Sequence, residues 1–434
     1  MKRVKIIADP KEAHGEDLTL CPGVNLYTGS KEFQSAFGNL TSLEEDILNI
    51  GAAIFATDIA LKRGENENMI RNIEITIPVV NLSTFRQVLD DIQYALYILS
   101  HDAWKINFVQ KLGLPEVPRK WNIENEGEVL LFSGGLDSFA AAIRSGVMGQ
   151  KTYLVSHVTA NQVISGTQQD LYEHLNSFYS NQFLRYSFRV SGIGKPSKGL
   201  DFPSDKHREE TQRTRSFMFL SLAGLVARRC SVKDVVMIAE NGQMAIHLPL
   251  SAGRISAFST HTAHPEFTTL MSSILSTVMD YNIAITNPFL YMTKAEVVAI
   301  LFPQHQTIIS KTVSCWKASR VSEFNHCGIC VPCLIRRIAL EHNECFIHEY
   351  AQDLLHSNVS KLGPDDDGKR NLVELCEFIN TFRRKQTLAE MERIYPELAS
   401  EDFDATQTIA MYQRFADEAM QVFHHYPQIM ALME

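Results

Sequence analysis

The stretch Glu128–Ile143, EVLLFSGGLDSFAAAI, decides the fold of this chain. Its first part, Val129–Phe132, is a short apolar run typical of a buried strand. The glycine-rich segment Ser133–Ser138 then turns the chain, and the apolar run Phe139–Ile143 predicts the start of a helix. A strand that enters a helix through such a turn exposes backbone N–H groups at the positive end of the helix dipole. Because glycine also lets an anion approach closely, we predict a phosphate or pyrophosphate site here.

A bare Gly-Gly pair is more often a simple turn, so the whole string has to be weighed. Here S-G-G-x-D-S follows a predicted strand and opens a predicted helix, and it resembles the pyrophosphate loop of the PP-loop ATPases. The resemblance implies that the loop binds ATP through Ser133, Gly134, Gly135, Leu136, Asp137 and Ser138. The kinase-type loop G-x-x-x-x-G-K-[ST] is absent, because Gly194-Lys195 is followed by Pro196.

Composition bounds the class of protein. The chain has 434 residues, 45% of them hydrophobic and 21% charged, as expected for a globular protein of about three domains. A net charge of −9 argues against a general nucleic-acid surface, which would be basic. No apolar run approaches the roughly 18 residues of a membrane helix, and the apolar run at the N-terminus is too short for a signal peptide. We expect a cytoplasmic protein whose eight cysteines are reduced thiols or metal ligands.

Residues 1–120 predict a small α/β accessory domain that docks a partner or forms oligomers. We expect a helix at 41–63 capped by Thr41 or Ser42, a second helix from Ser83 to Leu99, and strands at 4–8, 73–77 and 103–109. His14, Cys21 and His101 are isolated in the sequence, which favours structural roles. Residues 112–128 contain two prolines and mixed charge and are typical of a linker.

Between residues 127 and 310, predicted strands alternate with predicted helices. The further strands are expected at 152–157, 184–190, 235–239 and 283–286, and the further helices at 167–180 and 211–229. Alternation of this kind predicts an α/β fold with a doubly wound parallel sheet of the Rossmann type. Ligands of such sheets lie beyond the carboxyl ends of the strands, where the Ser-Gly-Gly turn and Asn241-Gly242 are expected.

Three later motifs narrow the resemblance to the QueC family, the 7-cyano-7-deazaguanine synthases of queuosine biosynthesis. The stretch 215–223, RSFMFLSLA, is similar to that family's R-N-x-x-F-L-S-L-A. The stretches 264–267, HPEF, and 287–296, NPFLYMTKAE, resemble its R-P-E-F and T-P-L-x-x-L-T-K-A-E. Ser216 and His264 replace the family's Asn and Arg, so the substrate is less clearly implied than the chemistry.

Arg215 and Lys294 are the candidate cations for ATP and a carboxylate substrate, because both lie in these motifs and can neutralise charge on phosphate. Glu266 is a candidate substrate or metal contact, with a surface carboxylate or helix cap as the plain alternative. Asp137 is expected to hold Mg²⁺ with ATP or to orient the loop. Arg213, Arg228 and Arg229 are expected to be solvated helix charges.

Residues 311–345 predict a zinc knuckle. Cys315, Cys327, Cys330 and Cys333 have the spacing C-x11-C-x2-C-x2-C, with Gly328 easing the tight turn. Four thiolates so close in sequence can surround one Zn²⁺ tetrahedrally and leave no open position for catalysis. An iron–sulfur cluster and His326 as a competing ligand remain alternatives. The QueC resemblance implies a four-cysteine zinc site at this point.

Residues 346–434 predict a helical C-terminal region, with helices near 371–384, 386–394 and 404–425. Together with residues 1–120 it extends the chain beyond the part that resembles the QueC family. In this the chain resembles the longer QueC-like proteins of Qat-type antiphage cassettes.

The resemblance implies an ATP-dependent C–N ligase. ATP would adenylate the carboxylate of a 7-carboxy-7-deazaguanine-like molecule, and a nitrogen nucleophile would then displace AMP. In the family that nucleophile is ammonia, which gives an amide, and a second ATP drives dehydration to the nitrile. A first alternative is transfer of the activated deazaguanine to an amine of a partner protein. A second is a nucleotide-binding regulator without catalysis. Sulfur transfer to tRNA is disfavoured by the net charge of −9.

Overall fold

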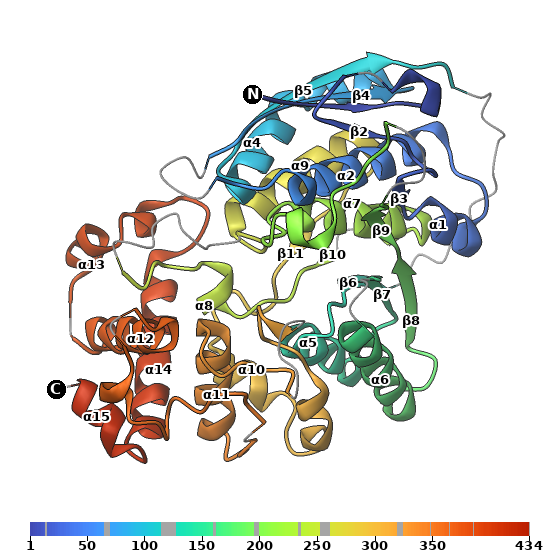
Figure 1. Cartoon of the computed structure of the whole chain (residues 1–434). Helices are drawn as coiled ribbons and strands as arrows, with labels where there is room; N and C mark the ends of the chain where they lie inside the picture. The colour runs from blue at the N-terminus through green and yellow to red at the C-terminus, as the bar shows by residue number, and fades with distance from the viewer. Residues whose placement is uncertain are drawn as a thin grey trace.

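The computed structural model describes residues 1–434 except 14, 65–69, 114–126, 159–161, 195–198, 233–235, 252–260, 319–323, 348, 364, 385 and 434, and except the side chains of residues 162 and 360. Two parallel sheets are stacked in it with helices between them (Figure 1). Most of the expected linker 112–128 and His14 lie outside the described residues.

The N-terminal sheet is four-stranded, parallel throughout, with the order β2-β1-β4-β5. Its strands are β1 (Lys2–Ile6), β2 (Leu18–Leu20), β4 (Asn72–Val79) and β5 (Ala103–Gln110). In β4 every second residue is buried, which confirms the strand predicted at 73–77. The sheet packs on helices that connect its strands, so residues 1–110 form an α/β layer as predicted.

The helix α2 (Ser42–Ala60) begins with a capping box between Thr41 and Glu44, as the sequence indicates. It is apolar on nearly all sides because it lies between the N-terminal sheet and the next helical layer. The single helix expected from Ser83 to Leu99 is wrong. The chain forms α3 (Leu82–Gln87) and α4 (Leu89–Ser100) instead, because Val88 leaves the helical conformation with φ −113° and ψ 14°.

The central sheet is five-stranded and parallel, with the order β11-β10-β6-β7-β8. Its strands are β6 (Glu128–Leu131), β7 (Thr152–His157), β8 (Phe183–Phe188), β10 (Val236–Met237) and β11 (Ile285–Thr286). Side chains of β6 alternate between two cores, with Val129 and Leu131 in one and Leu130 in the other. A sheet with a hydrophobic core on each face is doubly wound, and this confirms the predicted fold class.

Helices cover both faces of the central sheet (Figure 1). On one face, α5 (Leu136–Val147) and α6 (Gln162–Phe178) share a core with Leu130 and Leu154. On the other, α7 (Arg215–Arg229) and α9 (Pro265–Met279) share a core with Val129 and Val155. That second core continues without a break through α2 into the N-terminal sheet. The two sheets are therefore parts of one packed body in the described structure.

Two short segments tie the layers together at their edge. The strand β3 (Leu26–Thr28), which leads into α1 (Ser30–Phe37), pairs antiparallel with β9 (Val190–Gly192). The sequence predicts one strand at 184–190, whereas β8 ends at Phe188 and β9 begins at Val190. Strands of three residues carry too little pattern to be recognised, because the pairing is between segments far apart in the chain.

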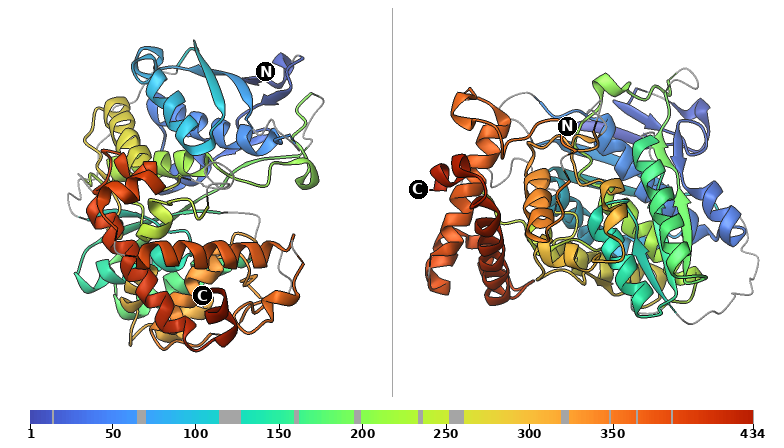
Figure 2. Two further views of the ribbon diagram at one scale, coloured as in Figure 1. Left: turned by 90° about the vertical axis from the view of Figure 1, so that its left-hand side faces the viewer. Right: turned by 90° about the horizontal axis from the view of Figure 1, so that it is seen from below.

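The C-terminal helices form a separate cluster at the side of the central sheet (Figures 1 and 2). They are α12 (Asp367–Arg383), α13 (Leu388–Ile394), α14 (Ala405–Phe423) and α15 (Pro427–Met433). This cluster has its own core and packs on α10 (Lys294–Ala299), α11 (Val331–His342) and α8 (Gly242–Ala245). The first three helices were predicted, and α15 was not.

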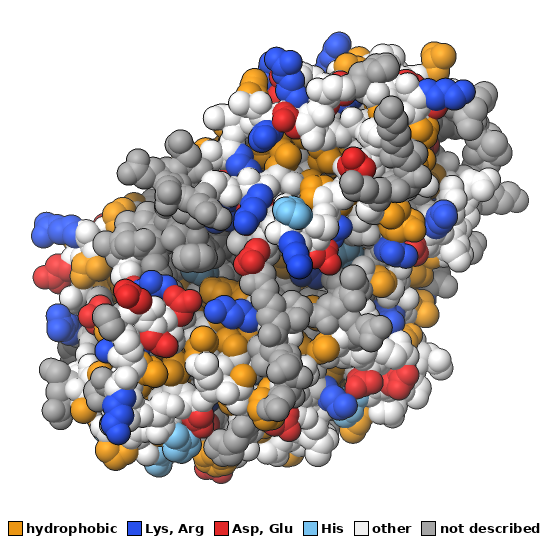
Figure 3. Space-filling view, viewed as in Figure 1, with side chains coloured by type: hydrophobic (Ala, Val, Ile, Leu, Met, Phe, Trp, Pro, Cys, Tyr) orange, Lys and Arg blue, Asp and Glu red, His pale blue; other side chains and the backbone are white. Residues whose placement is uncertain are grey.

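The surface seen in Figure 3 carries basic and acidic side chains side by side on its described part. This mixture agrees with the overall charge of −9 rather than with a basic face for nucleic acid. Within the described ranges, no helix is both long enough and apolar enough to cross a membrane.

Candidate active site

The Ser-Gly-Gly turn lies at the carboxyl end of β6, where the sheet geometry predicts a ligand site. Gly134 has φ +85°, a conformation that side chains with a Cβ rarely adopt, and its carbonyl accepts from the backbone N–H of Val313 at 3.1 Å. Gly135 is the N-cap of α5 and provides no side-chain cap, so the first amides of α5 stay available to an anion. The hydroxyls of Ser133 and Ser138 lie 3.2 Å apart beside them.

Asp137, in the first turn of α5, accepts a charged hydrogen bond from Lys294 Nζ at 2.7 Å. Its other carboxylate oxygen accepts from Asn241 Nδ2 at 2.9 Å. Both charged side chains are buried, with 12% of the Asp137 side chain and 7% of the Lys294 side chain exposed. The structure thus brings together two of the predicted site residues at the open end of α5.

Glu240, three residues after the end of β10, was not predicted as a site residue. It is partly buried, and this burial together with the negative charge of Asp137 raises the pKa of its carboxyl group to about 7. Its Oε2 accepts from Thr262 Oγ1 at 3.2 Å. Its position after a strand of the parallel sheet, next to Asn241-Gly242, was the available signal.

Lys294 is held from the C-terminal side of the molecule. Its backbone N–H donates to Gln243 Oε1 at 2.6 Å, and Thr293 before it donates to Glu418 of α14 at 2.7 Å. Burial raises the pKa of Glu418 to about 7, and Arg414 of α14 donates to Glu296 at 2.7 Å. The predicted helical region therefore supports the end of α10 that carries the lysine.

Arg215 is the first residue of α7 and lies near the carboxyl end of β7. Its guanidinium stacks on Phe219 at 4.9 Å, and Phe219 in turn packs edge-on against His157 at 5.5 Å. Burial lowers the pKa of Arg215 to about 10, and its buried Nε has no hydrogen-bond partner among the described residues. Burial and the Arg215 charge lower the pKa of His157 to about 3. Arg215 is thus a partly buried cation, and it forms no ion pair with a carboxylate among the described residues.

Glu266 lies in the first turn of α9, and its Oε1 accepts from the hydroxyl of Tyr94 on α4 at 2.5 Å. This hydrogen bond with the carboxylate, then burial, raise the pKa of Tyr94 to about 12. The described contacts of Glu266 are with the N-terminal layer, and they do not join it to the Ser-Gly-Gly turn.

Histidines from distant parts of the chain meet near Glu266, and sequence reasoning missed this cluster. The rings of His101 and His261 lie 5.6 Å apart, and those of His261 and His264 lie 5.1 Å apart. Burial, followed by the neighbouring histidines and Arg213, lowers the pKa of His261 to about 3, so the imidazole is neutral. His101 is isolated in the sequence, but its ring meets that of His261, 160 positions further along the chain, so the local sequence does not reveal this cluster.

The four predicted metal ligands form a buried cluster. The sulfur atoms of Cys315, Cys327, Cys330 and Cys333 lie within 4.8 Å of one another. The pairs Cys315–Cys330 and Cys327–Cys333 are each 3.9 Å apart, close to the ~3.8 Å between sulfurs of a tetrahedral site with Zn–S bonds of ~2.3 Å. The donor set therefore fits a structural zinc ion.

Two neighbours of this cluster confirm details of the sequence analysis. Gly328 has φ +79°, and a Cβ there would lie 1.8 Å from the carbonyl oxygen of Gln352, so only glycine fits. His326 accepts from the backbone N–H of Ser314 at 3.1 Å and is not part of the four-sulfur group. The other four cysteines, Cys21, Cys230, Cys345 and Cys376, are buried thiols outside this cluster.

A doubly wound parallel sheet with a Ser-Gly-Gly turn at a strand end, followed by a four-cysteine cluster, defines a PP-loop, Rossmann-like protein. Comparison with protein families is more specific. The family model described as queuosine biosynthesis protein QueC matches residues 127–344, half of the chain. The chain belongs to the QueC family, and the family indicates an ATP-using, ligase-type synthase activity related to the queuosine pathway. No curated protein matches the chain.

Proposed function

We propose that this protein adenylates the carboxylate of a 7-carboxy-7-deazaguanine-like molecule and joins the activated carbonyl to nitrogen. The observation that carries the proposal is the buried Asp137–Lys294 pair at the uncapped end of α5. A helix N-terminus with free amides binds phosphate, and a lysine beside it stabilises the charge that develops on a departing pyrophosphate. Membership of the QueC family supplies the substrate class.

In the proposed first step, a carboxylate oxygen of the substrate attacks the α-phosphorus of ATP. The bond between the α-phosphorus and the bridging oxygen breaks, and pyrophosphate leaves with both electrons. The amides of Leu136 and Asp137 at the start of α5, the hydroxyls of Ser133 and Ser138, and the Lys294 ammonium hold the pyrophosphate. Mg²⁺ that accompanies ATP would supply charge neutralisation, and Asp137 would be the residue to hold it. Arg215 then neutralises the remaining phosphate or the substrate carboxylate.

In the second step, an amine attacks the carbonyl carbon of the acyl adenylate. The C–N bond forms, the C–O bond to AMP breaks, and the amine loses a proton. Glu240 is suited to accept that proton, because its pKa of about 7 matches the working pH of a general base. With ammonia as the nucleophile the product is an amide, which a second ATP would convert to the nitrile.

The test is pyrophosphate release from ATP, measured with 7-carboxy-7-deazaguanine alone and with added ammonium. We expect release that depends on the carboxylate, followed by amide or nitrile in the presence of ammonium. Absence of release with this carboxylate and its close analogues would overturn the proposal and favour the non-catalytic regulator.

One observation favours transfer to a partner protein as a second candidate function. A cavity of about 880 Å³ lies at the carboxyl ends of the N-terminal sheet, near α1 and Arg189 and away from Asp137. Its lining includes Lys31 and Arg189, and Arg189 stacks on Tyr27 at 4.2 Å. The lining also includes the acidic residues Glu32 and Glu45, so the cavity offers room for an extended segment of a partner. Efficient nitrile formation with ammonium and no protein would count against transfer, and a role in antiphage defence remains a prediction.

A further inference from the structure

Helices α2 and α7 pack side by side and run in opposite directions. The start of α2 is bonded to the end of α7, and the end of α2 to the start of α7. At one end, Glu44 of α2 forms a buried ion pair with Arg229, the last residue of α7. At the other, Asp58 of α2 accepts from the backbone N–H of Thr214 at 2.9 Å and from its hydroxyl at 3.2 Å. Thr214 is the N-cap of α7. The carboxylate of Asp58 therefore caps the helix that begins with Arg215.

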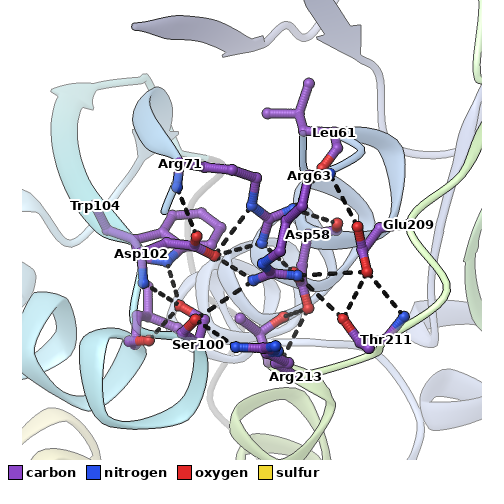
Figure 4. A network of polar contacts seen from close by, with 12 residues as sticks. Asp58, Leu61, Arg63, Arg71, Ser100, Asp102, Trp104, Glu209, Thr211 and Arg213 are labelled. Carbon is purple, nitrogen blue, oxygen red and sulfur yellow. Dashed lines mark hydrogen bonds and ion pairs between the residues drawn. The ribbon is translucent and has the colours of Figure 1, made fainter. Parts of the chain in front are cut away.

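Asp58 is in turn held by a buried network of charges (Figure 4). Arg71 donates to Asp58 and to Asp102, at 2.5 Å in each case. Arg63 also donates to Asp102 at 2.5 Å, and it reaches Thr211 at 3.1 Å. The expected solvated charge Arg213 is in fact buried, and it donates to the carbonyl of Ser100 at 3.1 Å. Arg229 is likewise buried rather than solvated.

The network joins the N-terminal layer to the segment that enters α7. Glu209 accepts from the backbone N–H of Arg63 at 2.9 Å, and its own N–H donates to the carbonyl of Ile59 at 2.8 Å. Residues 209–214 are therefore anchored at several points to residues 58–63 and to Ser100. This is why α7 starts at Arg215 and not at Thr211, where the sequence predicted it.

The charges of this network balance among themselves. It contains three carboxylates, from Asp58, Asp102 and Glu209, and three guanidinium groups, from Arg63, Arg71 and Arg213. Arg215 follows directly, and the described contacts of its guanidinium are with Phe219 and not with an acid. The network thus fixes the backbone next to Arg215 while leaving the charge of Arg215 to be neutralised by a ligand.

The same network fixes His101. Its neighbour Ser100 accepts from Arg213, and its other neighbour Asp102 accepts from Arg63 and Arg71. His101 has φ 56°, and its ring faces His261, whose neighbour Thr262 contacts Glu240. The imidazole of His101 thereby connects the N-terminal layer, through His261 and Thr262, to Glu240.

We propose that Asp58 is a positioning residue for Arg215, and that the N-terminal layer is an integral part of the active site rather than a separable docking module. The inference rests on the proposed function, since Arg215 is assigned there to bind phosphate or carboxylate. It assigns a role to a residue outside the 127–344 segment that the QueC family model covers.

The test compares Asp58→Asn with Glu44→Gln as a matched control. Both acids are fully buried on α2, and each holds one end of α7. Asparagine keeps an acceptor for Thr214, and glutamine keeps the capping box with Thr41. Removing one partner of a buried charge pair destabilises the protein in both cases, so we expect comparable losses of melting temperature. We expect Asp58→Asn alone to weaken ATP binding, by about tenfold, because a small displacement of a binding group is costly.

A double-mutant cycle separates positioning from general damage. If Asp58 acts through Arg215, the variant Asp58→Asn/Arg215→Ala binds ATP no more weakly than Arg215→Ala alone. Thr214→Val, which removes only the hydroxyl donor, serves where Asp58→Asn does not fold, and we expect about a threefold loss of ATP affinity from it. Additive losses of ATP affinity in the cycle would overturn the inference. Equal losses of ATP affinity in Glu44→Gln and Asp58→Asn would overturn it as well.

The two proposals fail in different ways. ATP affinity is measured by calorimetry without a carboxylate substrate, so it tests positioning whether or not turnover occurs. Wild-type protein that binds ATP but releases no pyrophosphate contradicts the proposed reaction only. Unchanged ATP affinity in Asp58→Asn, with normal pyrophosphate release, contradicts the positioning role only.

Discussion

Asp137 and Lys294 lie 157 positions apart in the chain, and their side chains meet in a buried ion pair 2.7 Å long. The pair joins the first turn of α5 to the first residue of α10, so it couples the Ser-Gly-Gly turn to a helix that the C-terminal region supports. An ion pair in such a place is costly to desolvate and gives little stability by itself. A role in binding phosphate explains why two charges are held there.

Lys294→Met is therefore expected to lower the rate of pyrophosphate release by about 100-fold or more, because the charge on the leaving pyrophosphate loses its stabilising ammonium. The variant also leaves Asp137 unpaired and should lose roughly 3 kcal/mol of stability. The matched control is Lys105→Met, which removes an ammonium 2.7 Å from Glu74 on the exposed face of the N-terminal sheet. We expect the control to change rate and stability very little. A Lys294→Met enzyme that keeps half of the wild-type rate would contradict this role.

Gly134→Ala tests the turn itself. Gly134 has φ +85°, so a side chain there costs about 1–2 kcal/mol and would press against Gln168 at 3.2 Å. We expect lower stability and weaker ATP binding, measured by thermal unfolding and calorimetry. Gly166→Ala is the control, since Gly166 lies in α6 with no atom within 4 Å of a Cβ. That change should stabilise the protein by up to about 1 kcal/mol. Equal changes of stability and of ATP affinity in the two variants would show that the turn has no special conformation.

Much of this site follows from local sequence. The strand β7 was predicted at its observed bounds, and the Ser-Gly-Gly turn and the four cysteines each lie within a short segment. Local pattern decides these features because strand alternation, turn torsions and metal-ligand spacing involve neighbouring residues.

The features that were missed depend on partners far away in the chain. Arg213 and Arg229 have the sequence context of surface charges, and they are buried because α2 supplies Asp58 and Glu44 at the two ends of α7. The raised pKa of Glu240 arises from burial and from Asp137, a residue of a different strand-helix unit. No periodicity within one segment carries this information.

Glu240 predicts a dependence of stability on pH. Its carboxyl group has a folded-state pKa of about 7, above the usual value of 4.5. Between those values the unfolded chain loses the proton while the folded protein keeps it, so wild-type stability falls as pH rises from about 4.5 to about 7. The loss is at most about 3 kcal/mol, and it levels off above pH 7. The variant Glu240→Gln lacks this titration.

We therefore expect the melting temperature of Glu240→Gln to rise relative to wild type between pH 5 and pH 7.5. Glu74→Gln is the control, because the hydrogen bond and ion pair with Lys105 lower the pKa of the Glu74 carboxyl group. The difference in melting temperature between Glu74→Gln and wild type should therefore not grow over this pH range. A difference between Glu240→Gln and wild type that is constant with pH would place the pKa of Glu240 near its ordinary value. It would also remove Glu240 as the proposed proton acceptor.

The four-sulfur cluster gives the last prediction. Cys330 lies 3.9 Å from Cys315, sulfur to sulfur, and is the N-cap of α11, which packs against both α10 and the C-terminal helices. Because metal binding is coupled to folding, Cys330→Ser should lose bound zinc and about 3 kcal/mol or more of stability. Elemental analysis of the purified protein and thermal unfolding with and without a chelator measure both effects.

Cys376→Ser is the matched control, since Cys376 is also buried but lies outside the cluster. It should keep one zinc ion per chain and respond to the chelator as the wild type does. Wild-type zinc content and melting temperature in Cys330→Ser would contradict the zinc assignment, and iron with acid-labile sulfide in the wild type would replace it with a cluster.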